Sequence, residues 1–200
     1  MTSFAAMLEE QRWDDHRYYH HSLVNQSLHM LSACTFVGAY IAAFWEPALA
    51  SLVAWIVAMT SRQIGHFFFE PKSYDAVNEA THAHKEAIKV GYNLKRKWIF
   101  MTLWVLSPLV LVANPSLFGL LEPHASPLDL ARNIGWLWLG LGIGGLVGRM
   151  VQLFFIRDVQ TGLVWATKII TDPFNDIRLY HRAPLRLLRG ERFDPGAAAH

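Results

Sequence analysis

The sequence has few of the features that mark soluble, secreted or nucleic-acid-binding proteins. Charged residues make up only 17% of its 200 residues, against roughly 25% in soluble domains. Its single cysteine, Cys34, cannot form an intrachain disulfide. The net charge of +2 is too small to indicate an anionic partner, and no nucleic-acid partner is expected. The N-terminal residues carry several acidic side chains and no short apolar core before a cleavage site, so a removable signal peptide is not expected.

Apolar residues, by contrast, make up 52% of the chain and gather in four long stretches. These stretches cover about residues 28–45, 48–69, 99–121 and 134–155. Each is close to the roughly 20 residues that a helix needs to cross a hydrocarbon layer of ~30 Å. The sequence therefore predicts an all-α, polytopic membrane protein that forms a single domain over residues 1–200, with four transmembrane helices arranged as two hairpins.

The positive charges predict how this domain is oriented. Fifteen of the eighteen Lys and Arg residues lie in the N-terminal segment, between Lys72 and Lys97, or from Arg157 onward. The turn at Glu46-Pro47 has none. Because cytoplasmic loops carry the excess of Lys and Arg, both termini and the 70–98 connection are expected in the cytoplasm. The expected location is a bacterial inner membrane or the endoplasmic reticulum.

Two cytoplasmic amphipathic helices are expected beside the membrane. In about residues 74–90, Val77, His84 and Ile88 follow a helical three-four spacing. In about residues 172–190, Asp172-Pro173 resembles an N-cap followed by proline at the first helical position. The arginines that follow among leucines are typical of a helix on an anionic leaflet.

Glycines repeat at four-residue spacing in the last apolar stretch, at Gly140, Gly144 and Gly148. Such a stripe lets helix backbones approach closely in lipid. It is therefore expected to serve helix packing within the bundle.

Eight of the ten histidines lie on or near the expected cytoplasmic side, and two fall at matching depths of the first hairpin. His29 lies seventeen residues before Glu46, and His66 lies nineteen residues after Pro47. At ~1.5 Å of rise per residue, a hairpin that turns at Glu46-Pro47 places them within about 3 Å of the same depth. The two imidazoles are thus expected to meet between neighbouring helices.

Two polar residues share helix faces with these histidines. Asn25 precedes His29 by four residues, and Glu70 follows His66 by four. Polar groups at the membrane boundary usually turn toward the bundle, where they bind, relay or pair. Asn25 is expected to orient a ligand rather than to bind an ion. Glu70 is expected either to bind an ion or to pair with a neighbouring cation.

The histidine pattern favours a metal site. The candidate ligands are His20, His29, His66 and His84, where His20 is favoured over the adjacent His21 and His84 lies on an apolar helix stripe. Imidazoles with a carboxylate and free coordination positions suit Fe(II), with Zn(II) or Mn(II) less favoured for oxygen chemistry. A hydrogen-bonded structural pair of His29 and His66 is the alternative.

Two motifs carry a resemblance to a known family. They are Tyr18-Tyr19-His20-His21 followed by Asn25 and His29, and Gln63-Ile64-Gly65-His66-Phe67-Phe68-Phe69-Glu70. Over roughly residues 15 to 75 the chain resembles the small membrane family whose fungal member is the Fe(II)-dependent 2-hydroxy-fatty-acid dioxygenase of sphingoid-base breakdown. The resemblance implies that His20, His29 and His66 are the motif histidines, with Asn25 and Glu70 as the motif asparagine and glutamate. It also implies an enzyme that uses dioxygen to shorten a 2-hydroxy fatty acid by one carbon.

On this hypothesis, Fe(II) is held by His29, His66 and one or two of the other candidates, and the acyl tail of the substrate stays among the membrane lipids. Arg62 or Lys72 is a candidate to hold the substrate carboxylate. Two other classes stay open: a haem-binding or other redox membrane protein with His29 and His66 as axial ligands, and a non-enzymatic lipid-binding scaffold. A histidine-box hydroxylase or desaturase is a poorer alternative, because no His-x-x-His-His motif occurs.

Overall fold

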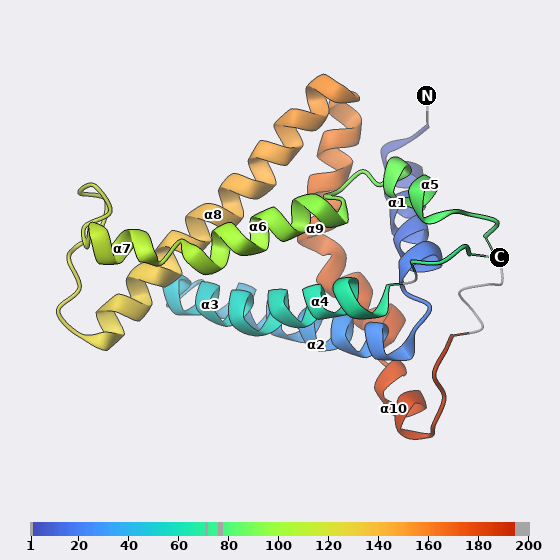
Figure 1. The fold of residues 1–200 in the computed structure, drawn as a ribbon, viewed down its shortest axis with the longest axis horizontal. Coiled ribbons are helices and arrows are strands. Elements are labelled where there is room, and N and C mark those ends of the chain that lie inside the picture. The colour runs from blue at the N-terminus through green and yellow to red at the C-terminus, as the bar shows by residue number, and fades with distance from the viewer. Residues whose placement is uncertain (1, 71, 76–77, 195–200) are drawn as a thin grey trace.

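The computed structural model describes residues 2–70, 72–75 and 78–194, and over these residues the protein is built from helices (Figure 1). In chain order they are α1 (Phe4–Tyr19), α2 (Leu23–Ala42), α3 (Pro47–Val53), the π-helical η1 (Ala54–Met59), α4 (Thr60–Ile64), the π-helical η2 (Gly65–Phe69), α5 (His82–Ile88), α6 (Leu94–Leu106), α7 (Leu109–Ala113), α8 (Pro127–Ile156), α9 (Val159–Tyr180) and α10 (Ala183–Leu188). The segments from α3 to η2 follow one another without a break. The all-α prediction is confirmed for the described residues.

Side-chain caps define where the two longest helices begin. Ser126 accepts a hydrogen bond from the backbone amide of Asp129 at 3.2 Å, and Asp158 accepts one from that of Thr161 at 2.8 Å. Each bond satisfies an amide that the first turn of a helix leaves without a partner. Pro127 follows Ser126 at the first position of α8, where no amide donor is needed.

Three helices in the described residues are long and apolar enough to cross a membrane, at Pro47–Phe69, Lys95–Ala113 and Pro127–Ile156. In the most apolar stretch of the second and third, only 11% of the residues are buried inside the protein, as expected for helices that face lipid. The first of the four predicted stretches, at about residues 28–45, falls largely within α2, which is not among these three helices. It buries Asn25, Gln26, His29 and Ser32 against its neighbours, and these polar residues lower its hydropathy.

Other predicted boundaries need correction. The stretch predicted at 99–121 is a helix only as far as Ala113, and turns follow it. The helix predicted at 74–90 is confined to His82–Ile88, while Val77 lies outside the described residues.

The helix predicted at 172–190 does not begin at Asp172-Pro173. Instead α9 begins after Asp158 and passes through Pro173, and α10 is a separate short helix. Proline usually ends or kinks a helix. Here Pro173 is fully buried, and Lys168 bonds to Asp172 across one turn at 2.6 Å, so packing and an ion pair hold the helix together.

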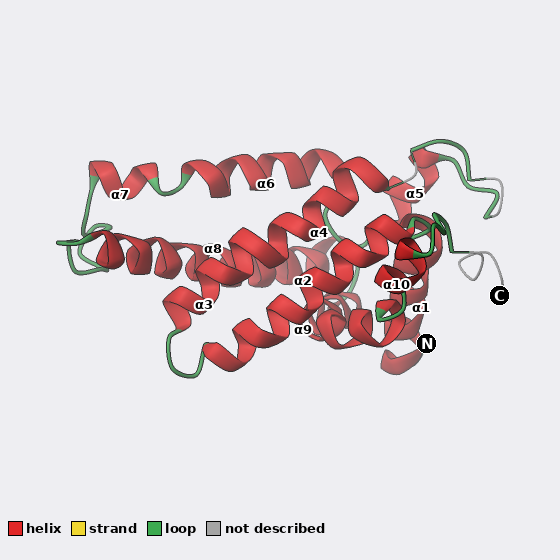
Figure 2. Cartoon of the chain, turned by 90° about the horizontal axis from the view of Figure 1, so that it is seen from below, coloured by secondary structure: helices red, strands yellow, loops and turns green. Residues whose placement is uncertain are grey.

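The helices are arranged so that the histidine-bearing segments meet at one end of the molecule. α2 and the α3–η2 segment form an antiparallel hairpin, and α9 packs against α2 and α8 (Figure 2). α1, α5 and α10 lie at one end, and the turn from α7 into α8 lies at the other (Figure 1). The C-terminal end of η2 therefore lies near the start of α2.

The close helix contact of α8 does not involve the predicted glycine stripe. A β-carbon added to Gly135 would collide with the backbone of Ala48, so this glycine sets the approach of α3 to α8. Gly140, Gly144 and Gly148 have no neighbouring atom within 4 Å of such a β-carbon. The packing role predicted for these three glycines is therefore wrong, and their faces are open.

Candidate metal centre

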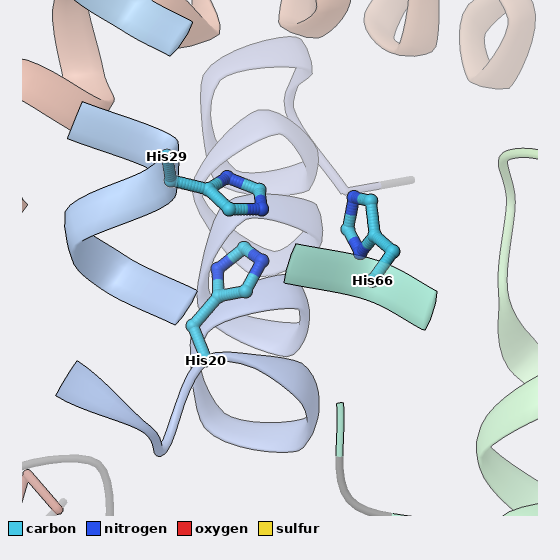
Figure 3. Close-up of side chains that lie close together, drawn as sticks. All are labelled: His20, His29 and His66. Carbon is cyan, nitrogen blue, oxygen red and sulfur yellow. The ribbon is translucent and has the colours of Figure 1, made fainter. Parts of the chain in front are cut away.

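Three histidines from different segments converge at the end of the α2–η2 hairpin. His20 follows α1, His29 lies in the second turn of α2, and His66 lies in η2. One nitrogen of each ring lies within 4.8 Å of one nitrogen of the other two, a spacing that permits one shared ion. The ring centroids are 4.1 Å apart for His20 and His29, and 4.9 Å apart for His29 and His66. Figure 3 shows the rings turned toward a common space.

The group is buried but incompletely hydrogen-bonded. His29 is 0% exposed and His20 is 3% exposed. Both ring nitrogens of His29 lack a hydrogen-bond partner among the described residues, and so does Nε2 of His20. Buried polar atoms without partners are rare, and an ion is one of the few explanations. Burial and the neighbouring His29 lower the pKa of His20 well below its ordinary 6.5, so His20 is in the neutral form that binds metals.

Glu70 orients His66 from the end of η2. Because a carboxylate only accepts, His66 Nδ1 donates to Glu70 Oε1, at 2.6 Å. Lys89 Nζ lies 3.4 Å from the same oxygen and balances its charge. This bond fixes the tautomer and leaves Nε2 of His66 as the basic nitrogen. Glu70 therefore orients the candidate metal ligand His66.

Residues of α9 that were not predicted from the sequence lie beside the other two imidazoles. The Tyr180 hydroxyl lies 2.8 Å from His20 Nδ1, and Asp176 Oδ2 lies 3.6 Å from His29 Nδ1. Asp172, Asp176 and Tyr180 follow one another at four-residue spacing. That single polar face was a usable signal, but the assumption that a helix starts at Asp172 concealed it.

Asn25 holds the connection between α1 and α2. Its Nδ2 donates to the Tyr19 carbonyl at 2.9 Å, next to His20. Its Oδ1 lies against Gly65 and has no partner among the described residues. Asn25 therefore lies beside the imidazole group and fixes the backbone that carries His20.

Replacing Gly65 with alanine is expected to destabilise the protein by about 1–3 kcal/mol, the usual cost of overpacking. The added methyl group would collide with Asn25 Oδ1 and lie 3.4 Å from His29 Cδ2. The measurement is the midpoint of thermal unfolding in detergent. Gly38→Ala is the matched control, because Gly38 has open space around it and alanine there should stabilise α2 by about 0.5–1 kcal/mol. Equal effects at the two positions would contradict the close contact.

Arg62 is occupied by carboxylates of the chain itself. It donates to Asp176 at 2.9 Å and lies 3.8 Å from Asp172. Lys168 bridges Asp172 and Asp15, and so joins α1 to α9. This placement differs from the expected role of Arg62 as an anchor for a substrate carboxylate, because its charge already has two partners.

His84 is not brought to the imidazole group. Thr81 caps α5, because its side chain accepts a hydrogen bond from the backbone amide of His84. A helix that starts here has Lys85 on its buried side and His84 on its exposed side. The predicted apolar stripe assumed a helix that begins several residues earlier. The expectation that His84 is a further ligand is therefore not met.

A cavity of about 1110 Å³ opens beside the imidazole group. His20 and His66 lie in its wall, together with the cations Arg62, Lys89 and Lys97 and the carboxylates Asp14, Asp15 and Asp172. Most of the remaining wall is apolar and includes tryptophans and the glycine stripe of α8. The open faces of these glycines thus widen the cavity. The space combines one charged, histidine-bearing region with a larger apolar region.

The comparisons with known proteins do not narrow the choice of function. The chain matches no protein-family model, no curated protein and no solved structure.

Proposed function

We propose that this protein is an iron-dependent oxygenase that acts on a membrane-embedded lipid, by one-carbon shortening of a 2-hydroxy fatty acid. The observation that carries the proposal is the buried group of His20, His29 and His66, with unpartnered nitrogens, in and behind the wall of a large apolar cavity. The resemblance of the two histidine motifs to the fungal dioxygenase family supports the reaction type.

The residues present fit a divalent metal ion. Three imidazoles suit iron, zinc and copper, and the remaining positions stay open for a substrate. Fe(II) bound there would supply the redox chemistry and a chelation point for the hydroxyl and carboxylate of the substrate. Glu70 and Tyr180 would hold the rings of His66 and His20 in one orientation, as partners of metal-bound histidines commonly do, while Asp176 lies 3.6 Å from His29 Nδ1.

The cavity supports a substrate with one anionic end and one long apolar chain. Lys97 lies in the wall with His66 and has no ion pair with any described carboxylate. A substrate carboxylate at Lys97 would place its 2-hydroxy carbon toward the imidazoles and its chain along the apolar wall. In this proposal Lys97 replaces Arg62 as the carboxylate anchor.

Lys97→Met is expected to raise KM for a 2-hydroxy acid by about 10- to 100-fold, because a hydrogen bond to a charged group contributes ~1.5–3 kcal/mol. Iron content should not change. Steady-state oxygen uptake in detergent measures the effect. The control is Lys95→Met, an exposed neighbour outside the cavity wall. A KM that is unchanged, or raised equally by both variants, would contradict this role.

Gly144→Leu is expected to fill part of the apolar cavity and shift the preference toward shorter acids. Gly144 lines the cavity and has no atom within 4 Å of an added β-carbon. The kcat/KM ratio of a long-chain to a short-chain 2-hydroxy acid should fall by about tenfold or more, from a steric cost of ~1–3 kcal/mol. Val147→Leu, on the exposed face of α8, should leave the ratio unchanged. A ratio unaffected by Gly144→Leu would argue against an acyl chain in this space.

The direct test is anaerobic loading of the purified protein with Fe(II), followed by oxygen and a panel of 2-hydroxy fatty acids. We expect about one iron per chain and an acid one carbon shorter, detected by mass spectrometry. Bound iron without consumption of any hydroxy acid would refute the reaction but leave the metal centre. A Soret band in the purified protein would favour the haem-binding alternative instead.

A further inference from the structure

A second hollow, of about 240 Å³, lies where α6 begins against the last two turns of α8. Its wall carries four cationic side chains, Lys89, Arg96, Arg149 and Arg157, and one carboxylate, Glu86. The hollow adjoins the larger cavity, because both are lined by Lys89, Val90, Gly91, Arg96 and Arg149. The small hollow is therefore polar and strongly positive.

Arg149 is the most constrained of these cations. It is 4% exposed. Its guanidinium donates to the backbone carbonyls of Val90 and Gly91 at 2.7 and 3.2 Å and to the Gln152 amide oxygen at 2.6 Å. Its Nε has no partner among the described residues. All of these acceptors are uncharged, so the buried charge of Arg149 is not compensated by them, which is costly.

The wall has too few carboxylates to balance its four cations. Lys89 pairs with Glu70 and with Glu86, the acidic residue of the wall. Arg96 and Arg157 make no ion pair with any described carboxylate. Three guanidinium groups thus face one hollow, and an anion is the group that would satisfy them.

We propose that this hollow binds the phosphate of an anionic phospholipid. Guanidinium groups bind phosphate oxygens in pairs and are favoured for this anion. The hollow lies where the candidate membrane helix Lys95–Ala113 begins, and the ends of membrane-spanning helices lie at the depth of the headgroups. The amino-terminal end of α6, capped by Asn93, adds a favourable dipole. Basic pockets between membrane helices are a known form of headgroup site.

The test measures lipid retention, which is independent of iron and of any oxygenase activity. The wild-type protein is reconstituted in nanodiscs of phosphatidylcholine with a minor fraction of phosphatidylglycerol, extracted and analysed by native mass spectrometry. We expect one tightly retained phosphatidylglycerol. Arg96→Gln and Arg157→Gln, at exposed positions, should each lower its affinity about tenfold, the loss of one charge-assisted contact.

Arg189→Gln is the matched control, because it removes the same charge from an exposed residue outside the wall. It should retain the lipid. Equal retention of phosphatidylcholine by the wild type, or equal loss in the Arg189 variant, would overturn the proposal, since bulk electrostatic attraction would then explain the binding. If inorganic phosphate raises the unfolding temperature as much as phosphatidylglycerol does, the site binds small anions, and the assignment to a lipid is wrong.

Discussion

The His29→Leu variant is expected to lose bound iron while its metal-free form keeps or gains thermal stability. His29 has two buried ring nitrogens without hydrogen-bond partners among the described residues. Leucine fills a similar volume and removes both orphaned polar atoms, a change that is neutral or favourable in a dry site. Loss of one ligand should weaken iron binding by more than about 100-fold, beyond the effect of losing a residue that only supports a ligand. Metal analysis and thermal unfolding of the metal-free protein measure the two effects.

His84→Gln is the control for this prediction, because His84 is an exposed histidine outside the group. It should leave the iron content unchanged. If His29 were only a structural residue, His29→Leu would lower stability and no iron would be present to lose. That outcome, or equal iron loss in both variants, would contradict the metal centre.

The sequence predicted the meeting of His29 and His66 because both positions follow from one local quantity, the rise per residue on either side of the turn at Glu46-Pro47. The two rings lie 4.9 Å apart between centroids. Helix periodicity could not place His20 next to them, because His20 follows the last residue of α1 and does not lie on a helix face. It was favoured over His21 without a geometric reason. Asp176 and Tyr180 could not be predicted by such counting, because they lie more than 100 residues away along the chain.

The errors in the predicted fold share a physical cause, because tertiary packing overrides the local preferences of proline and glycine. Pro173 normally marks a helix boundary, but here α9 continues through it. A glycine stripe normally marks a helix contact, but Gly144 faces a cavity, and Gly135 makes the contact instead. The polar residues of the histidine group also lower the hydropathy of α2, so the residues that predict the site set this helix apart from the three candidate membrane helices.

Lys168→Met is expected to destabilise the protein by about 3–5 kcal/mol, the usual cost of removing one partner from a buried ion pair. Lys168 donates to Asp172 at 2.6 Å and also pairs with Asp15. Burial alone would lower the pKa of Lys168, but these two carboxylates raise it, so the ammonium stays charged. Methionine keeps the volume and leaves two carboxylates without this cation. Thermal unfolding in detergent measures the loss.

The pH dependence distinguishes this ion pair from a packing effect. Although burial raises the pKa of Asp15, Lys168 lowers it below the ordinary 3.8. A depressed carboxylate pKa gives stability that is present above 3.8 and is lost as the pH falls below it. The wild type should therefore lose stability in acid, whereas the variant, whose Asp15 lacks the cation, should lose less. The gap between the two should narrow below about pH 4.

The control for Lys168→Met is Arg178→Met, an exposed cation on the same helix that donates to the neutral side chain of Asn175. It should change stability by no more than about 0.5 kcal/mol at any of these pH values. Because Asp172 and Asp176 also contact Arg62, the loss of Lys168 should reach the metal centre as well. We therefore expect weaker iron binding in Lys168→Met but not in Arg178→Met. A large stability loss that is independent of pH would show that Lys168 acts through packing alone.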